Sequence, residues 1–175
     1  MAALDASSTE IRYFLLSMLT TLLATPEYIR ASLAHVPGDT TKAVAKKLDR
    51  QTIIHDESKA FTFILTEQAV HWAVLPPRAM MLQVDRLVSL SRLPNIRIGV
   101  IPLGTYIPGC PLNTFTVYDS SLATVETETG IIVLRDPRDI QKYREIFSMY
   151  ENHAQFDEQA REKLEEWADT FRRDI

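Results

Sequence analysis

The stretch AMMLQVDRLVSLSRLPNIRIGVIPLG, residues 79–104, holds a helix and a strand in succession. Apolar side chains recur at 3.6-residue spacing in its first half, which predicts an amphipathic helix whose inner side holds Met80, Val84, Leu87 and Val88. Pro94 ends this helix, because proline has no N–H to donate. The β-branched run over residues 96–101 then predicts a strand buried on both faces, in which Gly99 indicates the close approach of another group.

The flanking segments extend this helix–strand unit in both directions. Apolar residues at helical spacing predict a first helix over residues 7–23, with Ser7 and Glu10 as a capping box. Further helices are predicted at residues 26–36, 41–54, 67–72, 137–150 and 157–171. Strands are predicted at residues 60–66, 114–118, 122–127 and 131–134. Thr25 and Asp136, each followed by proline, are expected to cap the helices that they precede.

This order of elements predicts an α/β or α+β fold. We expect N-terminal helices, a mixed central sheet of about five strands and two C-terminal helices. Residues 1–56 would form an N-terminal helical segment packed on an α/β core of residues 57–175, all within a single domain.

Composition excludes several classes of protein. The chain has 175 residues, 46% of them hydrophobic, and a formal net charge of −4, so the overall charge does not favour binding of nucleic acid. No apolar run is long enough for a membrane span, and no signal peptide is recognised. The single cysteine excludes an intramolecular disulfide. We therefore expect a cytoplasmic protein that does not act at a membrane.

No metal, cofactor or catalytic motif stands out. The four histidines lack ligand spacing, so we predict no metal site and no cofactor. Cys110 lies in a glycine- and proline-rich loop without a neighbouring histidine that would activate its thiol. Glu126 and Glu128 point to one face of a strand, where paired carboxylates serve either acid–base chemistry or, more commonly, solvation. We predict no catalytic residues and no enzyme.

Two other features favour binding. The predicted helix at residues 41–54 carries a basic cluster, which is either a solvated surface or a docking face for an acidic partner, at Lys42, Lys46, Lys47 and Arg50. The loop at residues 104–111 follows a buried strand, where ligands bind in open α/β sheets. We predict that ligand or partner binding involves Tyr106, Ile107, Glu126, Glu67 and Trp72.

Several segments together resemble one family: LLATPEYIRASL (22–33), AKKLDRQTII (45–54), ILTEQAVHW (64–72), LVSLSRLPNIRIGVIPLG (87–104), FTVYD (115–119), TVETETG (124–130) and LRDPRDIQKYREIF (134–147). They resemble the C-terminal module of unknown function of actinobacterial XRE-type helix-turn-helix transcriptional regulators. The resemblance implies an antitoxin-like role in sensing or partner binding, with no catalytic residues. About twenty residues precede the first of these segments, so we expect no DNA-binding domain and no direct DNA binding by this chain.

Three functions remain open. The first is a non-enzymatic effector domain of a transcriptional regulator that binds a small partner protein. The second is a small-molecule sensor, with its ligand near residues 104–111 and Glu126. The third is a small enzyme that uses Glu67, Glu126 or Cys110. A flat apolar patch on the first helix would favour the partner binder, and a cleft with converging polar groups would favour the sensor.

The N-terminal apolar run also predicts self-association. Residues 11–23 hold more large apolar side chains than one buried helix face needs. We therefore expect a homo-oligomer formed through this surface.

Overall fold

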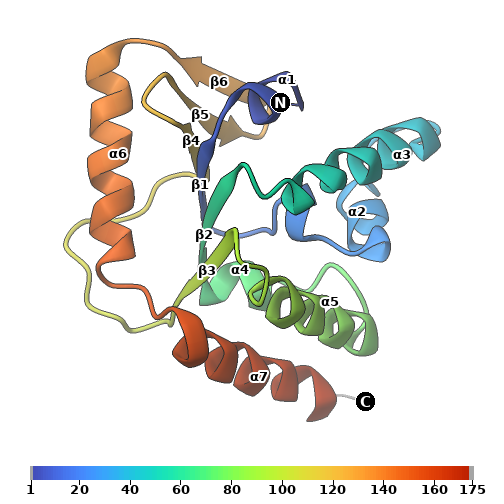
Figure 1. The fold of residues 1–175 in the computed structure, drawn as a ribbon. Helices are drawn as coiled ribbons and strands as arrows, with labels where there is room; N and C mark the ends of the chain where they lie inside the picture. Colours follow the sequence, from blue (N-terminus) through green and yellow to red (C-terminus); the bar gives the residue numbers. More distant parts are fainter. Residues whose placement is uncertain (1, 174–175) are drawn as a thin grey trace.

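The computed structural model describes residues 2–173 and has helices on both faces of one mixed sheet (Figure 1). The α-helices are α1 (Ala2–Ser7), α2 (Pro26–Ser32), α3 (Thr41–Arg50), α4 (Glu67–His71), α5 (Pro77–Leu90), α6 (Pro137–Glu151) and α7 (Asp157–Arg173). The strands are β1 (Glu10–Leu15), β2 (Ala60–Thr66), β3 (Ile96–Ile101), β4 (Phe115–Tyr118), β5 (Leu122–Thr127) and β6 (Gly130–Leu134). Two 3₁₀ turns, Thr21–Leu23 and Gln51–His55, complete the order.

The sheet has the strand order β3-β2-β1-β4-β5-β6. β1, β2 and β3 are parallel, with Ile11 opposite Phe61 and Phe61 opposite Ile96. From β1 onward the pairing is antiparallel, through β4 and β5 to β6. β1 therefore lies in the middle of the sheet, where its parallel and antiparallel halves meet.

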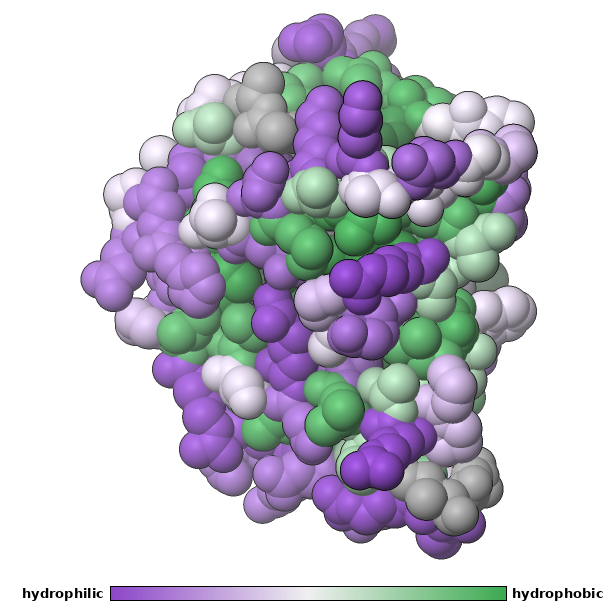
Figure 2. Space-filling view, turned by 90° about the vertical axis from the view of Figure 1, so that its right-hand side faces the viewer, coloured by the Kyte–Doolittle hydropathy of each residue, from purple (hydrophilic) through white to green (hydrophobic). Residues whose placement is uncertain are grey.

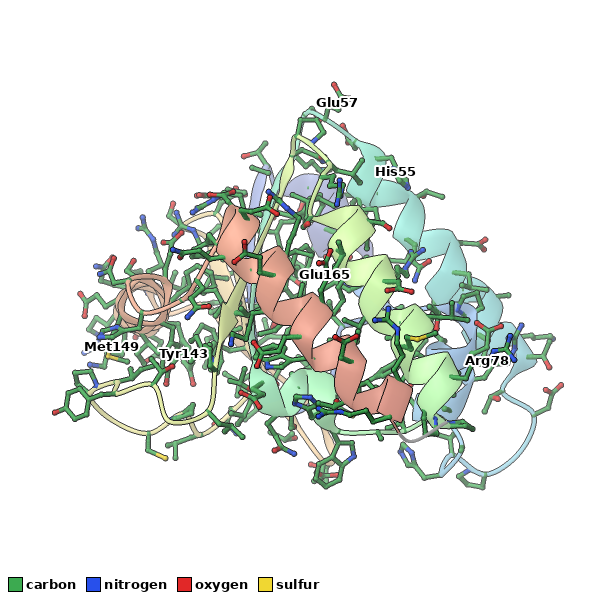
Figure 3. The ribbon with its side chains drawn as sticks, turned by 90° about the horizontal axis from the view of Figure 1, so that it is seen from below. His55, Glu57, Arg78, Tyr143, Met149 and Glu165 are labelled. Atoms are coloured by element: carbon green, nitrogen blue, oxygen red, sulfur yellow. The ribbon has the colours of Figure 1, made fainter. Side chains whose placement is uncertain are left out.

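Each face of the sheet has its own hydrophobic core. The larger core packs the side chains of Ile11, Tyr13 and Leu15 against α2 to α5 and α7. Figure 3 shows α5 and α7 side by side beneath this face, with Arg78 at the start of α5 and Glu165 on α7. The smaller core, around Phe14, lies under α6, which runs alone along the opposite face in Figure 1.

The predicted first helix over residues 7–23 is wrong. The helix ends at Ser7, and residues 10–15 form β1. A strand in a parallel arrangement is buried on both faces, so it has the continuous apolar run that a buried helix also has. Most of the apolar side chains over residues 11–23 are buried, while Met18 is 40% exposed, and self-association through this segment stays a prediction.

The other predicted elements are confirmed, as is the fold class. The sheet has six strands because β1 adds one to the five expected. Thr25 accepts a hydrogen bond from the Tyr28 amide, and Asp136 accepts one from the Arg138 amide, so both predicted N-caps are present. None of the helices described over residues 2–173 is long and apolar enough to cross a membrane.

Gly99 has the close neighbour that its position predicts. A Cβ atom at this position would lie 2.5 Å from the Phe156 ring, which the link between α6 and α7 lays across β3. The guanidinium of Arg97 covers the same ring, 4.4 Å from its centroid. In the same link, Val100 and Gln155 exchange two backbone hydrogen bonds of 2.9 Å.

Candidate functional site

A cleft of about 590 Å³ opens at the carboxyl end of β1, between the α2–α3 pair and the β5–β6 hairpin. We call it the polar cleft; its charged and ring-bearing lining residues are Tyr13, His35, Lys47, Arg50, Glu126 and Glu128. Five threonines also line it: Thr20, Thr21, Thr114, Thr127 and Thr129. The carboxyl end of a central strand is the usual place for ligands in open α/β sheets.

Hydrogen bonds between neighbouring segments hold the walls of the cleft in place. The Leu16 amide donates to the Thr114 hydroxyl at 3.1 Å, and the Glu126 amide donates to the Thr114 carbonyl at 3.0 Å. The Gln51 side chain donates to two carbonyls of the turn at residues 21–24, at 2.6 and 2.7 Å. Each of these bonds uses a backbone group of the wall, and none of them uses a charged side chain.

Opposite charges face each other across the polar cleft. Lys47 extends from α3 and donates to the Thr21 hydroxyl at 3.3 Å, while Glu126 extends from β5. Among the described side chains no ion pair joins these two, although each feels the charge of the other. The space between them suits a ligand that carries both acceptor and donor groups.

The cleft shifts the pKa values of both groups toward neutrality. Loss of solvent around the Glu126 carboxyl raises its pKa, against the opposing effect of Lys47 and Arg50. Loss of solvent lowers the pKa of Lys47, and the nearby Arg50 lowers it further. An acid with a raised pKa opposite an amine with a lowered pKa is typical of functional clefts.

Arg50 connects the cleft to a buried network behind it. Its guanidinium donates to the carboxylate of Asp5, a fully buried residue of α1, and to the Tyr13 hydroxyl at 3.3 Å. Tyr13 in turn donates to Asp5 at 3.2 Å. A buried carboxylate with two such partners is stable where an isolated one would not be. Arg50 is therefore held in one orientation at the wall of the cleft.

Two buried tyrosines that feel the charge of Asp5 stay protonated over a wide pH range. Burial raises the pKa of Tyr118 to about 12, with the Asp5 charge as a second cause. Burial and the charges of Tyr118 and Asp5 raise the pKa of Tyr13 well above its usual range. Both hydroxyls therefore act as neutral hydrogen-bonding groups at neutral pH.

The structure separates the residues predicted to bind a ligand. Glu126 lines the polar cleft. Tyr106 is 86% exposed, and Ile107 packs on the smaller core under α6. Glu67 and Trp72 lie at the end of β2, at α4 and just after it. The five residues therefore do not converge on one site.

Glu67 belongs to a chain of polar groups between α4 and α7. Its carboxylate accepts from the Leu103 amide at 2.9 Å and lies 3.5 Å from Nδ1 of His71. Nε2 of His71 lies 3.3 Å from the Thr170 hydroxyl. This order of acid, imidazole and hydroxyl resembles a nucleophilic triad, but Thr170 donates to the Trp167 carbonyl at 2.6 Å. The arrangement fixes α4 against α7.

The histidines, the acidic residues and the cysteine were also considered as metal ligands or nucleophiles. Within residues 2–173 no group of three or more His, Cys, Asp or Glu side chains is placed to hold a metal ion. Cys110 is an exposed free thiol.

Sequence reasoning found part of the polar cleft and missed the rest. The basic cluster predicted on residues 41–54 divides: Lys47 and Arg50 line the cleft, whereas Lys42 and Lys46 are exposed. The prediction of a helix over residues 7–23 hides the role of Tyr13, and Asp5 lies before the first predicted element. Burial does not alternate along this strand: Ile11, Tyr13 and Leu15 face the larger core, while Phe14 is buried in the smaller one, so no local signal in the sequence identifies Tyr13.

One protein family, described as "Domain of unknown function (DUF5753)", matches residues 1–166 of the chain. No curated protein matches the sequence.

Three solved structures show a similar arrangement. NucT from Helicobacter pylori is 9% identical and aligns over 87% of this chain and 86% of its own, with a TM-score of 0.51. Nuc from Salmonella typhimurium, a phospholipase D family member, is 12% identical over 89% of this chain and 86% of its own, with a TM-score of 0.49. TrmBL2, described as an archaeal chromatin protein, is 10% identical over 88% of this chain and 47% of its own, with a TM-score of 0.43.

These neighbours correct one prediction. The chain was expected not to be an enzyme, yet the structures that it resembles include a phospholipase D family member. At such low identity the likeness concerns the fold alone, so it assigns neither a reaction nor a substrate to this chain.

Proposed function

The chain belongs to DUF5753, a family of domains of unknown function, and we propose that it is an effector domain that binds a small polar molecule in the polar cleft. The ligand would carry an anionic or acceptor group toward Lys47 and Arg50, and a cationic or donor group toward Glu126 and Glu128. Amino acids, amino sugars and nucleosides have this chemistry.

One observation carries the proposal: Lys47 and Glu126 face each other across a cleft, each with a pKa shifted by loss of solvent. Lys47 has the Thr21 hydroxyl as its partner and no carboxylate of residues 2–173 at contact distance, and Glu126 is exposed at the end of β5, so both charges are free to pair with a ligand. Because Arg50 is already held by Asp5 and Tyr13, little ordering of this side chain is needed on binding.

The sequence resemblance supports a proposal about the kind of protein in which this domain acts. We place the domain in actinobacterial XRE-type transcriptional regulators, which act in the cytoplasm, with binding of DNA left to another domain. The net charge of −4 supports the proposal that this domain does not itself bind DNA. Ligand binding in the polar cleft would then report the level of a metabolite to the regulator.

The partner-protein alternative remains a prediction, although the first helix on which its apolar patch was expected does not form. An apolar patch on the first helix would have favoured it, and residues 11–15 form a buried strand instead. Figure 2 shows the side of the molecule that bears α3 and α5, where hydrophobic residues lie in short stretches between hydrophilic ones. A cleft with converging polar groups is the feature that favours the sensor.

The proposal is tested by thermal denaturation of the chain in the presence of amino acids, amino sugars and nucleosides, followed by calorimetric titration of each compound that stabilises it. A ligand at one hundred times its Kd adds about 2.7 kcal/mol to the free energy of unfolding. We expect Lys47→Met and Glu126→Gln each to weaken binding by about tenfold or more, since each removes a charged hydrogen-bonding partner.

Matched controls separate this site from general charge effects. Lys46→Met removes an exposed lysine of the same helix, and Glu145→Gln removes a carboxylate of α6 outside the polar cleft. Both variants should bind as the wild type does. Equal loss of affinity in the controls, or ligand binding that ignores Lys47→Met and Glu126→Gln, would refute the assignment.

A further inference from the structure

The two edges of the sheet differ in whether another segment pairs with them. At the β3 edge, Val100 and Gln155 exchange two backbone hydrogen bonds, so the link between α6 and α7 covers part of the strand. At the other edge, β6 pairs with β5, and within residues 2–173 no further segment pairs with its outer side. An uncovered edge strand presents backbone N–H and C=O groups to any strand that approaches.

The side chains of β6 do not discourage such pairing. The strand reads GIIVL, without charge or proline, and its three central residues are about half exposed: Ile131 at 45%, Ile132 at 52% and Val133 at 45%. Native sheets commonly protect an open edge with lysine, proline or a bulge. β6 has neither lysine nor proline, and its register with β5 runs without interruption.

We infer that β6 is a docking surface for a second copy of this chain, paired antiparallel through β6 of both copies. An antiparallel edge is its own complement under a two-fold axis, so one strand supplies both halves of the interface. With Ile132 on the axis, Ile131 of each copy lies opposite Val133 of the other. The two sheets then form one continuous sheet.

The charges that flank β6 favour this partner. Glu128 precedes the strand and Arg135 follows it, so antiparallel pairing brings the acid of one copy toward the base of the other. Asp136, the nearby carboxylate that would oppose Glu128, is already paired with Arg138 at 2.9 Å. Gly130 and Ile131 also line the polar cleft, so the second copy would border the cleft.

Disulfide trapping tests the register directly. In a Cys110→Ser background, Ile132→Cys places two thiols on the axis, where opposed Cα atoms in an antiparallel pair lie about 4.5–5.5 Å apart. That separation permits a disulfide. We expect mild oxidation to convert Ile132→Cys into a covalent dimer, while Leu82→Cys, an equally exposed site on α5, stays monomeric.

Analytical ultracentrifugation of the full chain is the second test, because it measures the mass of the particle in solution. We expect the wild type to reach twice 19.9 kDa as its concentration rises, and Ile132→Lys to remain at 19.9 kDa. Because Ile132 is half exposed, this variant should keep the circular dichroism spectrum of the wild type. A wild type that stays monomeric at every concentration, a dimer that survives Ile132→Lys, or equal cross-linking of Ile132→Cys and Leu82→Cys would overturn the inference. None of these results depends on a ligand in the polar cleft.

Discussion

Arg50 links the polar cleft to the buried interior of the domain. It lines the cleft on one side and contacts Asp5 and Tyr13 on the other. Asp5 is fully buried, so its carboxylate depends on these two partners for the hydrogen bonds that water would otherwise supply. The short helix α1 thereby fixes the side chain that a ligand would meet.

Asp5→Ala should destabilise the domain by about 3 kcal/mol, because it leaves the Arg50 guanidinium without its buried carboxylate. The free energy of unfolding from denaturant titration measures this loss. Asp49→Ala, at an exposed position of α3, should change the same quantity by less than about 0.5 kcal/mol. Equal stability of Asp5→Ala and the wild type would show that the network contributes nothing.

Gly99 shows how one residue positions two elements. β3 receives the Phe156 ring over a position that has no Cβ, and Arg97, two residues earlier on the same strand, stacks on the ring. The link between α6 and α7 can follow β3 closely only because this space is open.

Gly99→Ala should therefore cost about 1–3 kcal/mol, since the added methyl group must displace an aromatic ring. A double-mutant cycle with Phe156→Ala checks the cause. Once the ring is removed, Gly99→Ala should cost much less. Additive effects of the two substitutions would place the strain elsewhere.

The elements most visible in the sequence were those with an amphipathic period or a cap. α5, α6 and α7 have one buried stripe each, and Pro26 and Pro137 mark helix starts that the structure confirms. β1 could not be recognised in this way, because both of its faces are buried and its apolar run has no period to separate strand from helix.

Of the residues in the candidate site, only the charged ones could be predicted from the sequence. Glu126, Lys47 and Arg50 were visible as charged residues on a strand and a helix. Their convergence depends on the crossing from β3 to β4, which places β4 beside β1 and β5 beside β4. That topology also carries Tyr106, Glu67 and Glu126 to separate places, and no local pattern in the sequence specifies it.

The behaviour of the whole domain at high pH follows from its buried tyrosines. An unfolded chain releases the protons of Tyr13 and Tyr118 near pH 10, whereas the native protein keeps that of Tyr118 to about pH 12 and that of Tyr13 beyond its usual range. This contribution to stability is intact below pH 10 and is lost as the pH rises through the native pKa values.

The free energy of unfolding should fall between pH 10 and pH 12 by up to about 1.4 kcal/mol per pH unit for each buried tyrosine. Denaturant titrations across this range measure the slope, and ultraviolet absorbance of tyrosinate follows the ionisation. Tyr118→Phe should flatten the slope, while Tyr106→Phe, at an exposed position, should leave it unchanged. Identical slopes for both variants would contradict burial as the cause.

The central claim is that the polar cleft holds a small polar molecule through Lys47 and Glu126. Its most direct test is native mass spectrometry of the chain after gentle purification from host extract, comparing the wild type with the Lys47→Met/Glu126→Gln double variant. We predict one small polar compound bound to the wild type and to the Lys46→Met/Glu145→Gln control, and absent from the double variant. The same compound on all three proteins, or no bound compound on the wild type, would contradict the claim.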